Sequence, residues 1–235
     1  VYAVPFALSA LNIVFYNKTI FRKNGLEVPE TWDEFVNICK IMRERKIKPL
    51  IVGGKDSWPL LMISNAFVAA NETDLTSFAK DLWTRERKFN DEKSLKIWEM
   101  AFDFATYLPM NFNKIEYASI PERFANGEAA MLADGSWQAF SIMDKNPSIE
   151  LGCFTLPGYT KGTDPVQISC KYDMMLSVND KSPNREAALK WLEFLCEPQN
   201  YKKFVEEAQV IPVADIEVDN EFIKSLAPYM QNPSS

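Results

Sequence analysis

Short apolar runs of β type alternate along this chain with longer segments of helical periodicity, and this alternation constrains the fold more than any other feature. Extended runs open the chain and recur at residues 49–52, 129–133, 151–155 and 174–178. Between them, apolar residues repeat at the spacing of a helix that buries one face. The pattern predicts an α/β architecture with a largely parallel sheet.

The clearest helix start lies at Thr31. Thr31 precedes Glu34 by three residues, the spacing of a capping box in which each side chain bonds the backbone amide of the other residue. Phe35, Ile38 and Met42 then follow at helical spacing. We expect a helix from Thr31 onward, with one face buried and the other in water.

Two later segments also predict buried helix faces. Leu95, Trp98 and Phe102 recur at helical spacing, and Trp191 and Phe194 do so further on. We expect both groups to face the core. The opening of the chain reads as two extended stretches separated by small and polar residues at 7–12.

Composition excludes several classes of function. The 235 residues are 47% hydrophobic and 13% aromatic, enough for a sizeable core, and the formal charge is -6 without a basic block that would follow phosphates. The chain contains no histidine, which removes Ser-His-Asp and Cys-His catalysis and histidine-bound zinc. The absence of a basic block leaves a nucleic-acid partner without support.

The four cysteines are widely spaced and form neither a CxxC pair nor a zinc pattern. We interpret them as small buried hydrophobic residues, and a disulfide bond between two of them is the alternative. There is no P-loop or GxGxxG motif, so we expect no nucleotide and no other cofactor. No apolar run approaches the roughly 20 residues of a membrane span.

Two tryptophans stand where side chains can line a crevice. Trp58 and Trp137 each follow a loop at a helix start, and sequence position alone divides them evenly between core packing and ligand contact. Sugars present C–H faces that stack on aromatic rings and hydroxyl rims that need hydrogen-bond partners. Suitable polar partners follow at Asp134 and Ser136 and, later in the chain, at Lys171, Tyr172 and Asp173.

Carboxylates could instead indicate an enzyme. Asp56, Asp134 and Asp173 are candidates for an acid or nucleophile, but no spacing fixes any pair at the separation that glycoside hydrolysis needs. A cap, a turn or a solvated surface position explains each of them equally well.

Four segments, at 4–35, 123–137, 156–157 and 176–195, together resemble the family of extracellular solute-binding proteins that includes the maltodextrin receptors of ABC importers. The first carries Tyr16-Asn17-Lys18 and Thr31-Trp32-Asp33-Glu34, and the second ends in Gly135-Ser136-Trp137, similar to the Gly-x-Trp of that family.

The resemblance implies a type II periplasmic-binding-protein fold, with two α/β lobes joined by crossing strands and solute held between them. Residues 1–5 would belong to the hinge and first lobe and 6–160 to the second lobe; 161–214 would form the return crossing with part of the first lobe, and 215–235 the start of a C-terminal helical segment. The loop at 157–165 is the expected crossing. The chain would lack the start of the first lobe and the C-terminal helices.

The resemblance also implies particular ligand contacts. It assigns sugar stacking to Trp137 and, less directly, to Trp58, and it points to Ser9 and Asn12 in the first crossing. Residues 169–175 depart from the family, because Lys171, Tyr172 and Asp173 replace a glycine-rich approach to the strand. We expect this polar cluster to touch the ligand.

The implied function is capture of a sugar or oligosaccharide and its delivery to the permease subunits of an ABC importer. The protein would be a monomer outside the cytoplasm, in the periplasm or lipid-anchored on the outer face of the membrane, and not an enzyme. The alternatives are a carbohydrate-active α/β enzyme with paired carboxylates, a receptor for a non-sugar solute, and a sensory module that signals to a membrane kinase.

Overall fold

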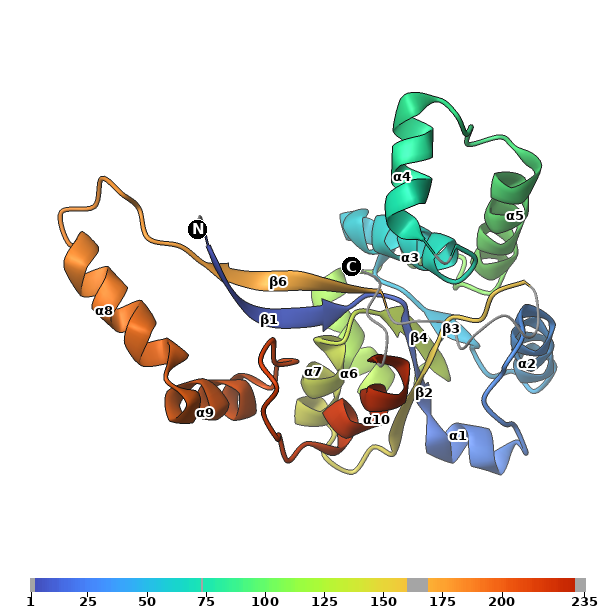
Figure 1. The fold of residues 1–235 in the computed structure, drawn as a ribbon. Helices are drawn as coiled ribbons and strands as arrows, with labels where there is room; N and C mark the ends of the chain where they lie inside the picture. The colour runs from blue at the N-terminus through green and yellow to red at the C-terminus, as the bar shows by residue number, and fades with distance from the viewer. Residues whose placement is uncertain (1–2, 73, 160–168, 231–235) are drawn as a thin grey trace.

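The computed structural model describes residues 3–72, 74–159 and 169–230, the last four of them as backbone only. A four-stranded sheet, in the order β3-β4-β2-β5, forms the centre of the molecule (Figure 1). Its strands are β2 (Ile13–Asn17), β3 (Leu50–Ile51), β4 (Met131–Asp134) and β5 (Leu151–Thr155). A separate two-stranded ribbon pairs β1 (Val4–Ala10) with β6 (Cys170–Leu176).

The sheet is mixed, so the expectation of a largely parallel sheet was wrong. β3 pairs with β4 in parallel, whereas β2 pairs antiparallel with both β4 and β5. β3, β4 and β5 therefore run in one direction and β2 runs against them. The reason lies in the connections: β2 enters straight from β1, whereas helices precede each of the other three strands.

Alternating side chains bury both faces of this sheet. Val14, Leu50 and Met131 belong to one apolar core, which also takes side chains from α1 (Lys18–Lys23), α2 (Trp32–Glu44), α3 (Trp58–Ala69) and α5 (Glu92–Thr106). Ile13 and Leu132 belong to a second core on the opposite face, with α6 (Ile120–Ala125), α7 (Gln138–Lys145) and α10 (Glu221–Met230). The result is a three-layer α/β unit (Figure 1).

The predicted start of α2 at Thr31 is confirmed, and other helices also have regular ends. The Thr31 hydroxyl accepts from the backbone of Glu34 and the Glu34 carboxylate accepts from the backbone of Thr31, which completes the capping box of α2. Gly127, two residues beyond the end of α6, has the positive φ of a helix C-cap, 74°. α4 (Leu75–Thr84) begins at Asp74, whose side chain accepts from Ser77 N–H.

The expected core face of α5 is wrong, because the buried residues lie on nearly the opposite side of the helix. Ile97, Met100 and Phe104 are buried, whereas Leu95 and Phe102 are 48% and 75% exposed. The helix carries apolar residues on two sides, and the side with Ile97, Met100 and Phe104 packs into the core with α3.

The observed limits of both ribbon strands differ from the expected ones. β1 continues through Ser9 to Ala10, so only Leu11 and Asn12 separate it from β2. β6 begins at Cys170, four residues earlier than the expected strand, because its pairing with β1 extends to Ala10.

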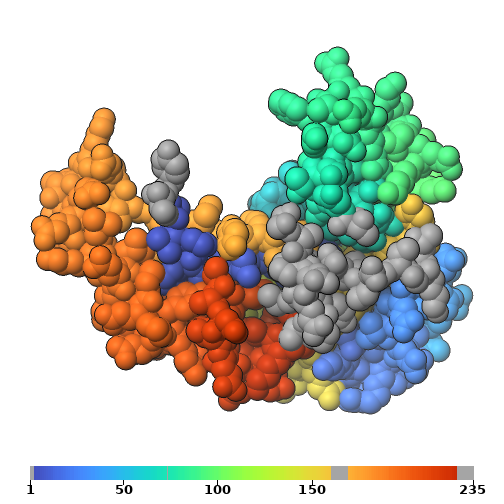
Figure 2. Space-filling view, in the orientation of Figure 1, coloured from blue at the N-terminus to red at the C-terminus, as the bar shows by residue number. Residues whose placement is uncertain are grey.

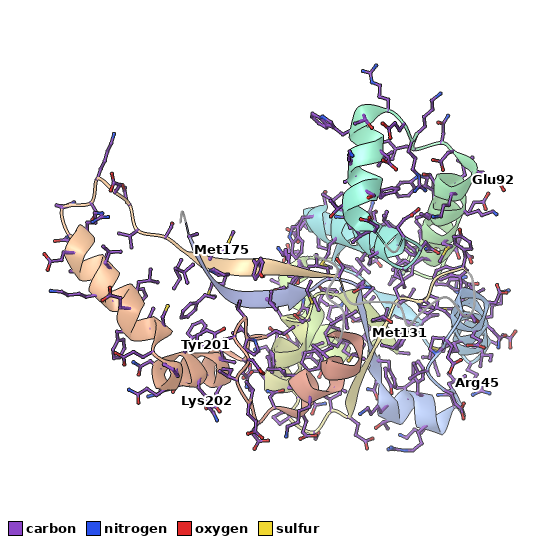
Figure 3. All side chains as sticks on the ribbon, viewed as in Figure 1. Arg45, Glu92, Met131, Met175, Tyr201 and Lys202 are labelled. Atoms are coloured by element: carbon purple, nitrogen blue, oxygen red, sulfur yellow. The ribbon has the colours of Figure 1, made fainter. Side chains whose placement is uncertain are left out.

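Beyond the ribbon, α8 (Arg185–Cys196) and α9 (Pro198–Ala208) form an outlying pair. Tyr201 of α9 points toward β1, and its hydroxyl donates to the Phe6 carbonyl at 3.0 Å (Figure 3). α8 is described over its whole length and buries none of its residues. The expected inward face of α8 is therefore wrong in this chain, since Trp191 and Phe194 are 58% and 53% exposed.

None of the helices in the described ranges is both long and apolar enough to cross a membrane. All four cysteines lie in those ranges and are free thiols. The lobe boundary expected near residue 160 and most of the crossing expected at 157–165 lie outside the described residues, so the division into lobes stays a prediction.

Candidate solute-binding site

One edge of the sheet collects the loops that carry the candidate residues. Ile13 pairs with both Asp134 and Thr155, so the start of β2 lies level with the ends of β4 and β5. Ile51, the last residue of β3, pairs with Leu132 and ends nearby. Ligands of open α/β sheets bind outside the carboxyl ends of the strands, and this edge is that place.

Three aromatic side chains meet at this edge, and we call them the aromatic cluster: Trp58, Tyr117 and Trp137. The Trp58 ring meets Tyr117 edge to face, with centroids 4.4 Å apart, and lies 6.3 Å from the Trp137 ring. Trp58 is the most open of the three, with 43% exposure. Such rings offer an apolar surface on which the C–H face of a sugar can stack.

Asp134 lies behind the aromatic cluster and is buried, with 3% exposure. Its Oδ1 accepts from the Gly135 N–H at 2.7 Å and from the Tyr117 hydroxyl at 3.1 Å, and its Oδ2 accepts from Gln138 Nε2 at 3.0 Å. Burial raises the pKa of Asp134 to about 7, although all three hydrogen bonds favour the ionised form.

The Tyr117 hydroxyl connects this carboxylate to the aromatic cluster. It donates to Asp134 and accepts from Trp137 Nε1–H. Burial, and after it the negative charge of Asp134, raises the pKa of Tyr117 well above its ordinary value. The phenol is therefore neutral at any physiological pH.

Two glycines bring Tyr117 to this position. A Cβ on Gly53 would lie 2.6 Å from the Tyr117 Cα, and one on Gly54 would lie 2.7 Å from the Phe112 ring. Both distances are too short for a side chain, so only glycine lets the 112–117 segment pack here. Asp56 then accepts from the Tyr117 backbone N–H at 2.8 Å, which gives that carboxylate a structural partner.

The polar residues of the ribbon form a second group. Ser9 Oγ donates to Asp173 at 2.7 Å, and Lys171 Nζ lies 2.6 Å from the other oxygen of Asp173. Burial opposes ionisation of Asp173, but Lys171 and Ser9 outweigh it and lower its pKa. Tyr172 points to the opposite face of β6, because successive strand residues alternate, and it is 58% exposed.

Asn12 and Ser136 tie the ribbon to the sheet edge. Asn12 is 1% exposed, and its Oδ1 accepts from the Ser169 N–H at 2.9 Å. Ser136 exchanges two bonds with Ala10: its N–H donates to the Ala10 carbonyl and its hydroxyl accepts from the Ala10 N–H. The aromatic cluster is thereby held next to the end of β1.

The surface above the ribbon is concave. Figure 2 shows the molecule hollowed over β1 and β6, with α8 on one side and the helices α3, α4 and α5 on the other. The loop that carries Asp134 and Trp137 is hydrogen-bonded through Ser136 to the end of β1, one of the two strands beneath this hollow.

A separate apolar cavity of about 370 Å³ lies between α3 and α5. Side chains such as Ile63, Phe67 and Phe104 line it, and Ser64 supplies its polar side chain. It offers little to fix the hydroxyl groups of a sugar. Within the described ranges, no three His, Cys, Asp or Glu side chains are grouped closely enough to hold a metal ion.

The structure thus brings Trp58, Trp137 and Asp134 together and joins Ser9 with Lys171 and Asp173 in a second group. It places Asn12 inside the protein and Tyr172 on the other face of β6. Contact of any of these residues with a ligand stays a prediction. Sequence reasoning missed Tyr117, which lies in a stretch without periodicity. The Gly53-Gly54 pair was interpreted only as a turn, and nothing in the sequence says which segment packs against it.

Comparison with known families decides the identity of this fold. The sequence profile of the bacterial extracellular solute-binding protein family matches residues 2–202. The chain belongs to this family. The predicted family and the α/β fold class are therefore confirmed.

Individual solute-binding proteins show the same relationship. The multiple sugar-binding protein of Streptococcus mutans is 28% identical over 212 residues, which cover 87% of this chain and 49% of that protein. The structure of RafE in complex with raffinose superposes with a TM-score of 0.82 at 26% identity, over 97% of this chain and 60% of RafE. A Bacillus licheniformis sugar transporter in complex with stachyose shares the fold at 21% identity, with a TM-score of 0.80.

This solute-binding protein chain spans about half the length of the curated relatives it matches, 49% for both the S. mutans protein and the melibiose/raffinose/stachyose-binding protein MelE of Bacillus subtilis. The family consists of binding proteins rather than enzymes, and its description places it outside the cytoplasm.

Proposed function

We propose that this chain acts in an extracytoplasmic receptor of an ABC importer that captures a sugar or oligosaccharide and presents it to the permease. The observation that carries the proposal is the aromatic cluster at the carboxyl edge of the sheet, with Trp58 open to solvent and Trp137 beside it. Rings at this edge suit the C–H face of a sugar, and nearby polar groups suit its hydroxyls.

The relatives favour the same class of solute. The S. mutans protein is a multiple sugar-binding protein, and RafE, at 26% identity, is known in complex with raffinose. A strongly charged solute finds less support, because Lys171 already pairs with Asp173. Hydrolysis of the solute also finds less support, since Asp134 is buried and Asp56 and Asp173 each hold a partner.

A thermal-shift screen tests the proposal, carried out on this chain and on the longest product that its gene encodes. Raffinose, stachyose and malto-oligosaccharides are the probes, with amino acids and polyamines as controls. A ligand at about 100 times its dissociation constant adds about 2.7 kcal/mol, which raises the melting temperature by about 5 to 10 °C for a protein of this size. A rise confined to sugars supports the receptor, and a flat screen of the longest product overturns the sugar assignment.

A matched pair of tryptophan variants then tests the site. We expect Trp137→Ala to weaken sugar binding at least tenfold, because it removes a stacking ring. Trp83→Ala is the control, since Trp83 is 89% exposed on α4, away from the aromatic cluster. Equal affinity of Trp137→Ala and the parent would contradict the assigned site.

A further inference from the structure

The hydrogen bonds around Tyr117 have a fixed direction. Trp137 Nε1–H can only donate, so the Tyr117 oxygen must accept from it. The single proton of the hydroxyl then needs a different acceptor, and Asp134 Oδ1 is that acceptor at 3.1 Å. The carboxylate therefore determines which way the hydroxyl points, and the hydroxyl determines where the indole is held.

The surroundings of Asp134 leave little room for a direct contact with solute. The side chain is 3% exposed, and both of its oxygens already accept hydrogen bonds. The groups that face it are the Gly135 N–H and the Gln138 amide on its own side and the Tyr117 hydroxyl across the loop. Among the described residues that shift its pKa, Tyr117 is the only other titratable group.

We propose that Asp134 is a positioning residue for solute binding, which acts through the Tyr117 hydroxyl to hold the Trp137 indole in place before the solute arrives. The inference rests on the proposed function and assigns Asp134 a role different from the ligand contact that the sequence predicted. It also makes Tyr117 the third ring of the binding surface. A surface assembled in advance avoids the cost of ordering side chains on binding.

The first test needs no ligand. In a ¹⁵N-labelled chain the six tryptophans give six indole N–H resonances, and the one missing in Trp137→Phe belongs to Trp137. We expect Tyr117→Phe and Asp134→Asn each to move that resonance. The first removes the acceptor of the indole N–H, and the second replaces the carboxylate that accepts from the Tyr117 hydroxyl with an uncharged, weaker amide acceptor. In the parent the same resonance should also shift with pH as Asp134 titrates, near pH 7. Asp74→Asn and Tyr107→Phe are matched controls outside the site and should leave it in place.

The second test is a double-mutant cycle with raffinose as the probe, on the longest product of the gene. Each single variant should weaken binding by about threefold to tenfold, the worth of one hydrogen bond. The double variant should bind no more weakly than Tyr117→Phe alone, because Asp134 acts through that hydroxyl. Additive losses would mean that Asp134 contacts the solute directly and would overturn the proposal.

The two tests separate this inference from the function on which it rests. An unmoved Trp137 resonance in both variants, with sugar binding intact in the parent, overturns the positioning role alone. A coupled resonance in a parent that binds no sugar overturns the sugar assignment alone. Tyr117→Phe keeps the ring and the buried carboxylate, so it carries the test if Asp134→Asn does not fold.

Discussion

At Asp134, burial and hydrogen bonding act in opposite directions on the same carboxyl group. The effect of burial is the larger one, and it raises the pKa of Asp134 from 3.8 to about 7. Between those two values the folded state holds a proton that the unfolded state has lost, so stability falls as the pH rises through this window. The effect of Glu128 on stability has the opposite sign. Its hydrogen bond with Arg123 lowers its pKa to about 2, so the stability that it contributes is lost as the pH falls below the ordinary pKa of 4.5.

Asp134→Asn should therefore gain stability relative to the parent as the pH rises. The amide keeps an acceptor for Tyr117, and Gln138 can turn its own amide over to meet the new N–H donors. Melting temperatures measured between about pH 4 and pH 8 should show the difference between variant and parent moving in favour of the variant. For Asp74→Asn the difference should stay flat, because the pKa of Asp74 lies below 3.8. A flat difference for Asp134→Asn would contradict the raised pKa.

Local patterns singled out two residues that the structure brings together, and their contact with a ligand stays a prediction. Trp58 and Trp137 were singled out because each follows a loop at a helix start, and the structure brings their rings to within 6.3 Å. The burial of Asp134 could not be predicted in this way. It depends on Tyr117, which comes from another loop and reaches Asp134 only through the folded chain.

Elements with their signals in adjacent residues were also predicted well. The capping box of α2 and the limits of β5 needed nothing from elsewhere in the chain. Features set by distant partners were not predicted: the direction of β2, the length of β1 and the buried stripe of α5. The connection from β1 decides the direction of β2, pairing with β6 decides the length of β1, and packing decides the buried side of α5.

The turn after β3 offers a prediction at this scale. Gly53→Ala would force a Cβ to within 2.6 Å of the Tyr117 backbone, so the Tyr117 segment must shift. We expect a loss of about 1 to 3 kcal/mol in stability, together with a moved Trp137 indole resonance and weaker sugar binding.

Gly158→Ala is the matched control for this turn, because its Cβ would meet the Ala70 carbonyl at 2.4 Å, far along the chain from Tyr117. It should lose stability but leave the Trp137 resonance unchanged. A Gly53→Ala variant with normal sugar affinity would show that the position of Tyr117 does not matter to binding.

At the scale of the whole molecule, the apolar stripe on α8 is exposed to solvent. Helical periodicity predicted that Trp191 and Phe194 face inward, and the stripe does exist, but in this chain both side chains are more than half exposed. Periodicity identifies which residues share a face, whereas only the rest of the fold determines whether that face is covered.

The exposure of α8 predicts a small effect of substitution. Trp191→Ser should change the free energy of unfolding of the 235-residue chain by less than about 0.5 kcal/mol, as surface substitutions do. Val205→Ala on α9, where the side chain is fully buried, should cost about 2 kcal/mol. Chemical denaturation measures both. A loss for Trp191→Ser as large as that for Val205→Ala, and dependent on protein concentration, would show that a second copy covers this face.

The reversed strand β2 also sets the order in which the molecule can fold. Tyr16 pairs with Met131 and Asn17 with Leu151, so both neighbours of this strand are synthesised about half a chain length after it. The ribbon closes later still, since Ser9 and Asp173 are 164 residues apart in sequence. A nascent chain therefore carries its central strand with both edges unpaired until β4 and β5 have been made. Early helices can form on their own, but the sheet edge that holds the aromatic cluster can be completed only after β5 has been made.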